Sequence, residues 1–272
     1  MALRERVQVK TPEHVRAMRR AGLVVAAALD AVRAALRPGV TTAELDAVAA
    51  AVIRAAGATP SFLGYHGYPA STCVSVNDEV VHGIPGPRVL QPGDLVSVDC
   101  GAVVDGWHGD AAFSAVLDPA DPADLALVAA TERAMWAGIA ALAGATRTSA
   151  VGEAVDDEVA DRYGIIEEYV GHGIGTAMHQ PPDVPNYRSR DRGARVRPGL
   201  VVAVEPMLVR GTPETHELAD GWTVKTDDGS RAAHVEHTVA VTAGGLWVLT
   251  ATDGGAAGLA PFGVTVVEAR AL

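Results

Sequence analysis

The chain has 272 residues, of which 49% are hydrophobic, with a net charge of −11 and only two cysteines, Cys73 and Cys100. This acidic balance argues against phosphate-backbone binding as the main activity, so nucleic acid is not an expected partner. Two cysteines at this spacing form neither a zinc motif nor a disulfide framework. The N-terminal segment is charged and lacks the apolar core of a signal peptide, and no apolar run is long enough to span a bilayer. We therefore expect a cytoplasmic protein without a membrane segment.

Two helices are predicted at the start of the chain. Thr11 suits the N-cap, and the proline after it suits the first position, of a helix over residues 12–36. Thr41 and Glu44 have the spacing of a capping box and begin a second helix that reaches residue 56, where a glycine follows.

A predicted β-hairpin follows a loop rich in glycine and tyrosine (SFLGYHGYPAS), a strand through CVSVN and the turn HGIPGP. The segment DLVSVDCGAVVDGWHGDAAFSAVL predicts two strands joined by a two-residue turn, Asp105-Gly106. With that turn Asp110 faces Gly101, and Asp99, two residues before Gly101, lies on the same face. Asp99 and Asp110 are then diagonal cross-strand neighbours, with backbones roughly 7–8 Å apart.

The second half repeats this order, with helices over 123–143 and 149–164 and strands near 165–170, 200–205, 222–226 and 232–241. Placing 149–164 over 42–57 aligns several residues of similar type at a constant offset, which indicates an internal duplication. No linker-like stretch separates the halves. We predict one α+β domain spanning 1–272, in which two similar halves, about 12–118 and 119–250, surround a central, mainly antiparallel sheet.

Four carboxylates and one imidazole lie in or beside short apolar runs: Asp99, Asp110, His172, Glu205 and Glu236. Each one alone is more often a solvent-facing residue. Charged side chains are rarely buried unless they are paired or bound to metal, and two divalent cations would neutralise four carboxylates. Together the five residues therefore indicate a dinuclear metal site, in which a bridging water is a hydrolytic nucleophile. Carboxylate-rich ligation with one imidazole favours manganese, iron, cobalt or zinc.

These residues and their flanks resemble the type I methionine aminopeptidases of bacteria over nearly the whole chain. The segments that carry the resemblance are VKTPEHVRAMRRAG, RPGVTTAELD, GYHGYPASTCVSVNDEVVHGIPG, DLVSVDCGAVVDGWHGD, GHGIGTAMHQPP, VVAVEPML and HVEHTVAVT. The resemblance implies the pita-bread fold. It also implies that Asp99 binds one ion, that His172 and Glu205 bind the other, and that Asp110 and Glu236 bridge the two.

The activity implied by the resemblance is removal of the N-terminal methionine from nascent proteins and peptides with a small second residue. A bridging hydroxide would attack the first peptide carbonyl, and Glu205 would shuttle a proton to the leaving nitrogen. His179 would hydrogen-bond the developing oxyanion, and His82 would face the scissile amide. The implied partners are nascent polypeptide N-termini and a ribosome contact, and the implied state is a monomer.

The resemblance also places a methionine-binding pocket around Phe62, Tyr65, Tyr68, Cys73, His82, Met178, His179 and Trp222. An aromatic cluster is more often core than pocket, but a loop position between glycines favours recognition. Phe62 is larger than the residue that some relatives place there. We expect no role in the site for His66, His108, His234 and His237, and we assign His108 to the strand face opposite Asp110.

Three alternatives stay open from the residues alone. A prolidase-like Xaa-Pro peptidase shares the five-ligand set but usually carries an additional N-terminal domain, for which a chain that begins its first helix by residue 12 leaves no space. A non-catalytic binding module of the same fold would lack metal ligands, and none is lost here. A structural protein with incidental acidic residues would not bind metal stoichiometrically.

Overall fold

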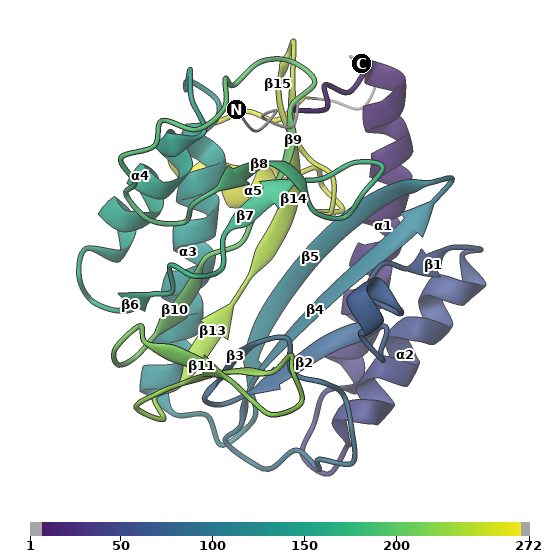
Figure 1. The fold of residues 1–272 in the computed structure, drawn as a ribbon, viewed down its shortest axis with the longest axis vertical. Coiled ribbons are helices and arrows are strands. Elements are labelled where there is room, and N and C mark those ends of the chain that lie inside the picture. Colours follow the sequence, from purple (N-terminus) through teal and green to yellow (C-terminus); the bar gives the residue numbers. More distant parts are fainter. Residues whose placement is uncertain (1–6, 268–272) are drawn as a thin grey trace.

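The computed structural model describes residues 7–267 (Figure 1). Its helices are α1 Pro12–Ala35, α2 Thr42–Ala55, α3 Pro122–Ala141, α4 Ser149–Val159 and α5 Ala256–Leu259, with 3₁₀ turns at Tyr65–Gly67 and Ala260–Phe262. Its strands are β1 Thr59–Pro60, β2 Thr72–Val76, β3 Glu79–Val81, β4 Leu95–Val104, β5 Trp107–Val116, β6 Gly164–Ile165, β7 Gly171–Gly173, β8 Gln180–Val184, β9 Val201–Val204, β10 Met207–Val209, β11 Thr215–Glu217, β12 Val224–Thr226, β13 Ala232–His234, β14 Glu236–Thr242 and β15 Gly245–Val248. Within 7–267, no helix is long and apolar enough to cross a membrane. Residues 1–6, at the start of the segment used for the signal-peptide prediction, lie outside the described range.

A nine-stranded sheet forms the centre of the molecule. Its strand order is β1-β4-β5-β14-β9-β7-β8, with β2 also paired to β4 and β15 to β14. The strand pairs are antiparallel, as predicted. Two three-stranded sheets, β13-β10-β6 and β11-β12-β3, flank it. In Figure 1 the pair α1–α2 lies to the right of the central sheet and the pair α3–α4 to the left.

The β4–β5 hairpin confirms the predicted register. Asp105 and Gly106 both have positive φ, +51° and +78°, as tight hairpin turns require. Gly101 pairs with Asp110, and Asp99 pairs with Ala112. Because side chains alternate along a strand, both aspartates point to one face of the sheet.

The predicted helix starts are confirmed by their caps. Thr11 Oγ1 accepts a hydrogen bond from the His14 N–H at 3.3 Å. Thr41 Oγ1 accepts from the Glu44 N–H at 3.2 Å, and the Glu44 carboxylate accepts in return from the Thr41 N–H at 2.7 Å. Both caps satisfy backbone donors that a helix cannot pair internally.

The alternation of side chains along each strand also explains why one face of the sheet is not covered by helices and can carry polar residues. Val98 and Cys100 of β4 are fully buried in a hydrophobic cluster with Val25 and Ile53 of α1 and α2. Asp99, between them in sequence, faces the other way. A second cluster packs α3 and α4 against β9 and β14 in the same manner. The helices therefore cover one face, and the opposite face carries the acidic residues.

The two parts of the central sheet meet at a narrow seam. Strand β5 pairs with β14 through two residue pairs only, Glu236 with Ala112 and His237 with Ala111. Thr238 strengthens this contact, since its Oγ1 accepts from the Asp110 N–H at 3.1 Å and donates to the Asp110 carbonyl at 2.8 Å. The duplication that we infer from the sequence stays a prediction.

Some predicted boundaries are wrong. Helix α4 ends at Val159 rather than at 164, because Ala160 and Asp161 take left-handed φ values of +50° and +58°. Of the strand expected at 165–170 only β6, Gly164–Ile165, forms. The strand expected at 232–241 is two strands, β13 and β14, which belong to different sheets and separate at Val235.

Candidate metal centre

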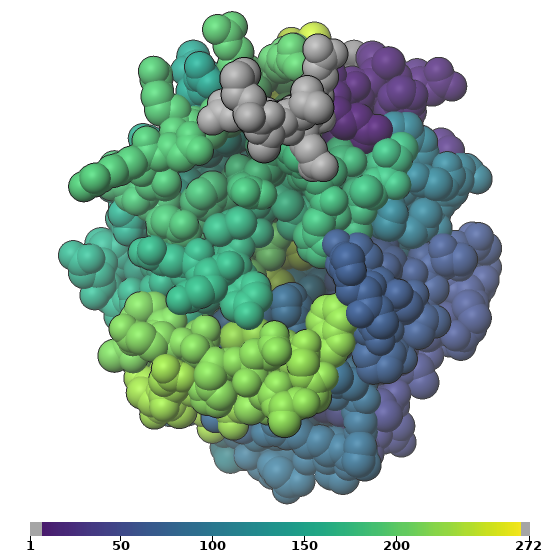
Figure 2. All heavy atoms as spheres, in the orientation of Figure 1, coloured from purple at the N-terminus to yellow at the C-terminus, as the bar shows by residue number. Residues whose placement is uncertain are grey.

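A hollow of about 250 Å³ opens at the centre of one face (Figure 2). Every residue predicted for metal or substrate binding lines it: Phe62, Tyr65, Tyr68, Cys73, His82, Asp99, Asp110, His172, Met178, His179, Glu205, Trp222 and Glu236. These residues come from segments far apart in the chain, so only the folded sheet brings them together.

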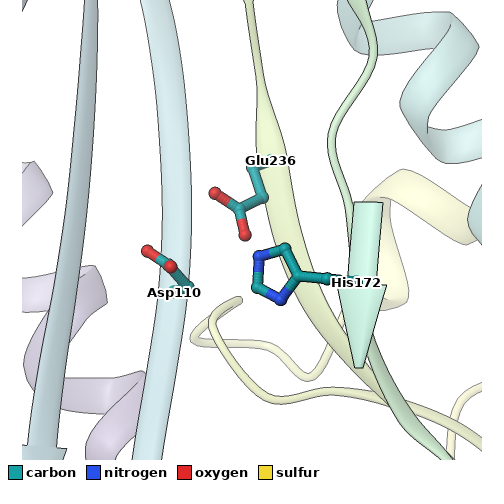
Figure 3. A group of neighbouring side chains, drawn as sticks. All are labelled: Asp110, His172 and Glu236. Atoms are coloured by element: carbon teal, nitrogen blue, oxygen red, sulfur yellow. The ribbon is translucent and has the colours of Figure 1, made fainter. Parts of the chain in front are cut away.

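The acidic wall of the pocket is built by neighbouring strands of the central sheet. Asp99 lies on β4, Asp110 on β5, His172 on β7 and Glu236 on β14, and Glu205 directly follows β9. In Figure 3 the side chains of His172 and Glu236 approach each other, and Asp110 lies beside them on the neighbouring strand. One ligand atom from each of these three lies within 4.8 Å of the others. Glu205 Oε1 lies 3.3 Å from His172 Nε2.

Four carboxylate oxygens of this wall are buried without a hydrogen-bond partner: Asp99 Oδ1, Asp110 Oδ1, Glu205 Oε1 and Glu236 Oε1. Buried acceptors without partners are uncommon, because each has lost its water without gaining another contact. Divalent cations would supply the missing partner for all four. The donor set therefore fits hard or borderline divalent metal ions.

The raised pKa values of these carboxyl groups also show that their charged forms are poorly stabilised in the absence of cations. Burial raises the pKa of Asp99 to about 7. Burial, followed by the charges of neighbouring carboxylates, raises the pKa of Asp110 and that of Glu236 well above the ordinary range. Burial and then Asp99 do the same to the pKa of Glu205. So many anions cannot be ionised together unless cations are bound among them.

His172 is held in the form that a metal ligand needs. Its Nδ1 lies 3.1 Å from the Gly173 carbonyl, and a carbonyl can only accept, so Nδ1 carries the proton. Burial, and then the charge of His179, lowers the pKa of His172 to about 3, so the ring is neutral. Its Nε2 lone pair therefore faces Glu205, and the backbone sets this tautomer. His172 lies on the short strand β7.

The other half of the pocket is apolar. Phe62, Tyr68, Cys73 and Met178 are buried together, with Trp222 packed against them. The rings of Tyr68 and Trp222 meet edge to face at 5.0 Å, and those of Phe62 and Tyr68 at 6.4 Å. Burial strongly raises the pKa of the Cys73 thiol, which keeps it protonated and unreactive. This half suits an apolar side chain.

Two more histidines stand between the apolar and acidic walls. Burial, then the charge of His179, lowers the pKa of His82 to about 4. The ring of His82 meets that of Trp222 edge to face at 6.3 Å. His179 packs its ring against His172 at 4.2 Å, and its Nδ1 lies 2.8 Å from the Tyr65 hydroxyl.

His234 contradicts our expectation, because it lines the pocket. Its Nε2 is buried without a hydrogen-bond partner and lies 3.8 Å from Glu205 Oε2. Ser114 fixes its backbone, accepting from the His234 N–H at 3.0 Å and donating to its carbonyl at 2.8 Å. Its spacing of two residues from Glu236 was the only signal in the sequence. The sequence also did not point to Val81, Glu168, Tyr169, Val170 and Met207, which complete the lining.

The assignment of His108 to the face opposite Asp110 is wrong. His108 pairs with Val103 and Asp110 with Gly101, so the two residues are separated by one full alternation and share a face. His108 Nδ1 lies 2.9 Å from Ser61 Oγ, outside the pocket. His66 and His237 also lie outside the pocket lining.

Comparison with known proteins identifies the family. Residues 16–243 match the sequence pattern of metallopeptidase family M24. Methionine aminopeptidase 1 of Mycobacterium tuberculosis is 54% identical over 242 residues, which cover 86% of this chain and 91% of that protein. The chain belongs to the methionine aminopeptidases of metallopeptidase family M24. Methionine aminopeptidase 1 of Bacillus subtilis is 42% identical, over 89% of this chain and 98% of its own length.

Superposition on solved structures supports the same family assignment. A methionine aminopeptidase from Thermotoga maritima superposes with a TM-score of 0.87 at 38% identity, covering 90% of this chain and 99% of that one. A prolidase from Pyrococcus furiosus shares the fold alone, with a TM-score of 0.71, 19% identity and coverage of 90% of this chain and 65% of the prolidase. The predicted pita-bread fold is confirmed, and the chain is a metallo-exopeptidase of the methionine aminopeptidase type.

Proposed function

We propose that the protein removes the N-terminal methionine from peptides and nascent proteins whose second residue is small, with two divalent cations as cofactors. One observation carries the proposal. The buried carboxylate oxygens that lack hydrogen-bond partners line the same pocket as a cluster of apolar side chains. Such a cluster can pack against the thioether side chain of methionine. A hydrolytic metal site beside such a cluster acts on a bond next to an apolar side chain.

The residues proposed to hold the ions are the five predicted from the sequence. Asp99 would bind one ion, His172 and Glu205 the other, and Asp110 with Glu236 both. When bound, such a pair of ions polarises a carbonyl and lowers the pKa of water, which supplies a nucleophile at neutral pH. Manganese, iron, cobalt and zinc all suit this donor set.

The remaining steps belong to side chains of this chain. Phe62, Met178 and Trp222 would enclose the methionine side chain and exclude water from it. Glu205 would carry a proton to the leaving nitrogen. His179 would donate a hydrogen bond to the carbonyl oxygen as negative charge develops on it, and His82 would orient the scissile amide. Tyr68 and Cys73 would complete the pocket wall.

The proposed setting is the cytoplasm, where nascent chains offer free N-termini, with a ribosome contact and a monomeric enzyme. The family's substrate, the N-terminus of a nascent polypeptide, supports this setting.

The test compares two substrates with protein stripped by a chelator and reloaded with manganese or cobalt. One substrate is a Met-Ala-Ser peptide and the other an Xaa-Pro dipeptide. Metal-dependent release of methionine from the first alone supports the proposal. Cleavage of the Xaa-Pro bond alone would assign a prolidase-like activity instead. Stoichiometric metal binding without cleavage of either would leave a binding module of the same fold. His172→Ala and Asp110→Ala should abolish turnover in a folded protein.

A further inference from the structure

Tyr65 makes a contact that its place in an apolar pocket wall does not require. Its hydroxyl lies 2.8 Å from His179 Nδ1, across more than a hundred residues of sequence. Within residues 7–267 this hydroxyl has no other hydrogen-bond partner. The contact therefore ties the Tyr65 loop to the histidine that, in the proposed function on which this inference rests, faces the scissile carbonyl.

The loop that carries Tyr65 has an unusual backbone conformation with several positive φ angles. Gly64 and Gly67 have φ values of +84° and +90°, and His66, between them, has φ +46°. A non-glycine residue in that region costs energy and persists only when the surroundings hold it there. The Tyr65 N–H donates to the Phe62 carbonyl at 2.9 Å, and the His66 ring packs against the Tyr65 ring at 4.4 Å. These contacts hold the loop in the shape in which the Tyr65 hydroxyl lies beside His179.

The partner of one ring nitrogen decides what the other can do. A neutral imidazole has one N–H donor and one acceptor nitrogen. His172 and His179 lie in contact, with ring centroids 4.2 Å apart, but their Nδ1 atoms have different partners. In His172 the partner is the Gly173 carbonyl, which can only accept, so Nε2 is left as a lone pair for a cation. In His179 the partner is a phenol hydroxyl, which is a good donor.

We propose that Tyr65 is a positioning residue that donates its hydroxyl proton to Nδ1 of His179 and so keeps Nε2 as an N–H donor toward the pocket. Two touching histidines are thereby set in opposite tautomers. One presents a lone pair to metal, and the other presents a proton to the substrate oxygen. The reverse arrangement, with Nδ1–H donating to Tyr65, would leave His179 without a proton for that oxygen.

The test is the tautomer of His179, observed by ¹⁵N NMR of histidine-labelled protein loaded with zinc, which is diamagnetic. The His179 signals are assigned by their loss in His179→Gln. We expect the proton on Nε2 in the wild type and a mixture of both tautomers in Tyr65→Phe, which removes only the hydroxyl. Tyr187→Phe, which removes a hydroxyl outside this pocket, should leave the His179 signals unchanged.

Kinetics supply the second readout. On the Met-Ala-Ser peptide, Tyr65→Phe should lower kcat about 10-fold and change KM less than about twofold, because the lost alignment acts in the transition state. A wild-type His179 proton on Nδ1, or an unchanged tautomer in Tyr65→Phe, would overturn the proposal. If the wild type shows the Nε2 proton but releases no methionine, the proposed function fails while the role of Tyr65 in setting the ring stands.

Discussion

Removal of metal should make the stability of the protein depend on pH through Asp99. An unfolded aspartate loses its proton near pH 4, whereas burial raises the pKa of Asp99 in the folded, metal-free site to about 7. Between these pH values the folded state binds more protons than the unfolded state. Stability therefore falls as the pH rises through this range.

The size of this effect follows from the same pKa. The rise from 3.8 to about 7, at about 1.4 kcal/mol for each pH unit, amounts to about 4 kcal/mol for an isolated, fully buried group. Asp99 is only partly buried and its carboxyl group interacts with that of Asp110, so we expect about half of this, or about 2 kcal/mol. The uncharged Asp99→Asn variant escapes this cost. At pH 8, without metal, it should be about 2 kcal/mol more stable than the wild type, a rise in Tm of about 5 °C.

Urea unfolding of chelator-treated protein at pH 5 and pH 8 measures this difference. The gain from Asp99→Asn should be much smaller at pH 5 than at pH 8. Addition of manganese at pH 8 should reverse the order, because it stabilises the wild type by mass action and the variant much less. Asp105→Asn is the matched control, since Asp105 is exposed at the turn of the same hairpin and asparagine tolerates its φ of +51°. An Asp99→Asn variant that follows the wild-type pH dependence would refute the reasoning.

Three further predictions concern groups that support the fold or the site. Thr41→Ala removes the capping box of α2 and should cost about 1 kcal/mol in urea unfolding without changing kcat; a fall in kcat would contradict a purely local role. Gly109→Ala should cost about 1–3 kcal/mol in the same assay, because its Cβ would lie 2.7 Å from the Gly22 nitrogen; wild-type stability would show that α1 can move away. Asn186 is fully buried, donates to the Glu205 carbonyl at 3.2 Å and accepts from its N–H at 3.4 Å. Asn186→Ala should therefore weaken manganese affinity in calorimetry about 10–100-fold, and unchanged affinity would show that Glu205 needs no such support.

The parts of the fold that follow local chemistry could be predicted from the sequence. The capping residues Thr11 and Thr41 predict where α1 and α2 begin. The two-residue turn at Asp105-Gly106 sets the register of the hairpin, which places Asp99 and Asp110 on one face. The small sheets could not be predicted in this way. Strand β10 has three residues, too few to show a period, and its partners β13 and β6 come from distant parts of the chain.

The same distinction between local and long-range contacts applies to the candidate site. The approach of Asp99 to Asp110 follows from the hairpin. The approach of His172, Glu205 and Glu236 depends on pairings between distant strands, and the sequence indicated it only indirectly, through charged residues in or beside apolar runs and through the resemblance. His234 could have been placed at the site from the sequence, because side-chain alternation along the predicted strand 232–241 puts it on the same face as Glu236.

The narrow seam between β5 and β14 would give ions bound at the proposed site a mechanical role. Asp99 and Asp110 lie on one side of the seam, His172 and Glu205 on the other, and Glu236 forms one of its two residue pairs. Ions shared among these side chains would cross-link the sheet where its own hydrogen bonding is sparsest. The stability of the β5–β14 pairing and the affinity for metal would then be coupled. A substitution that weakens this pairing, even far from the pocket, would first lower the affinity for metal.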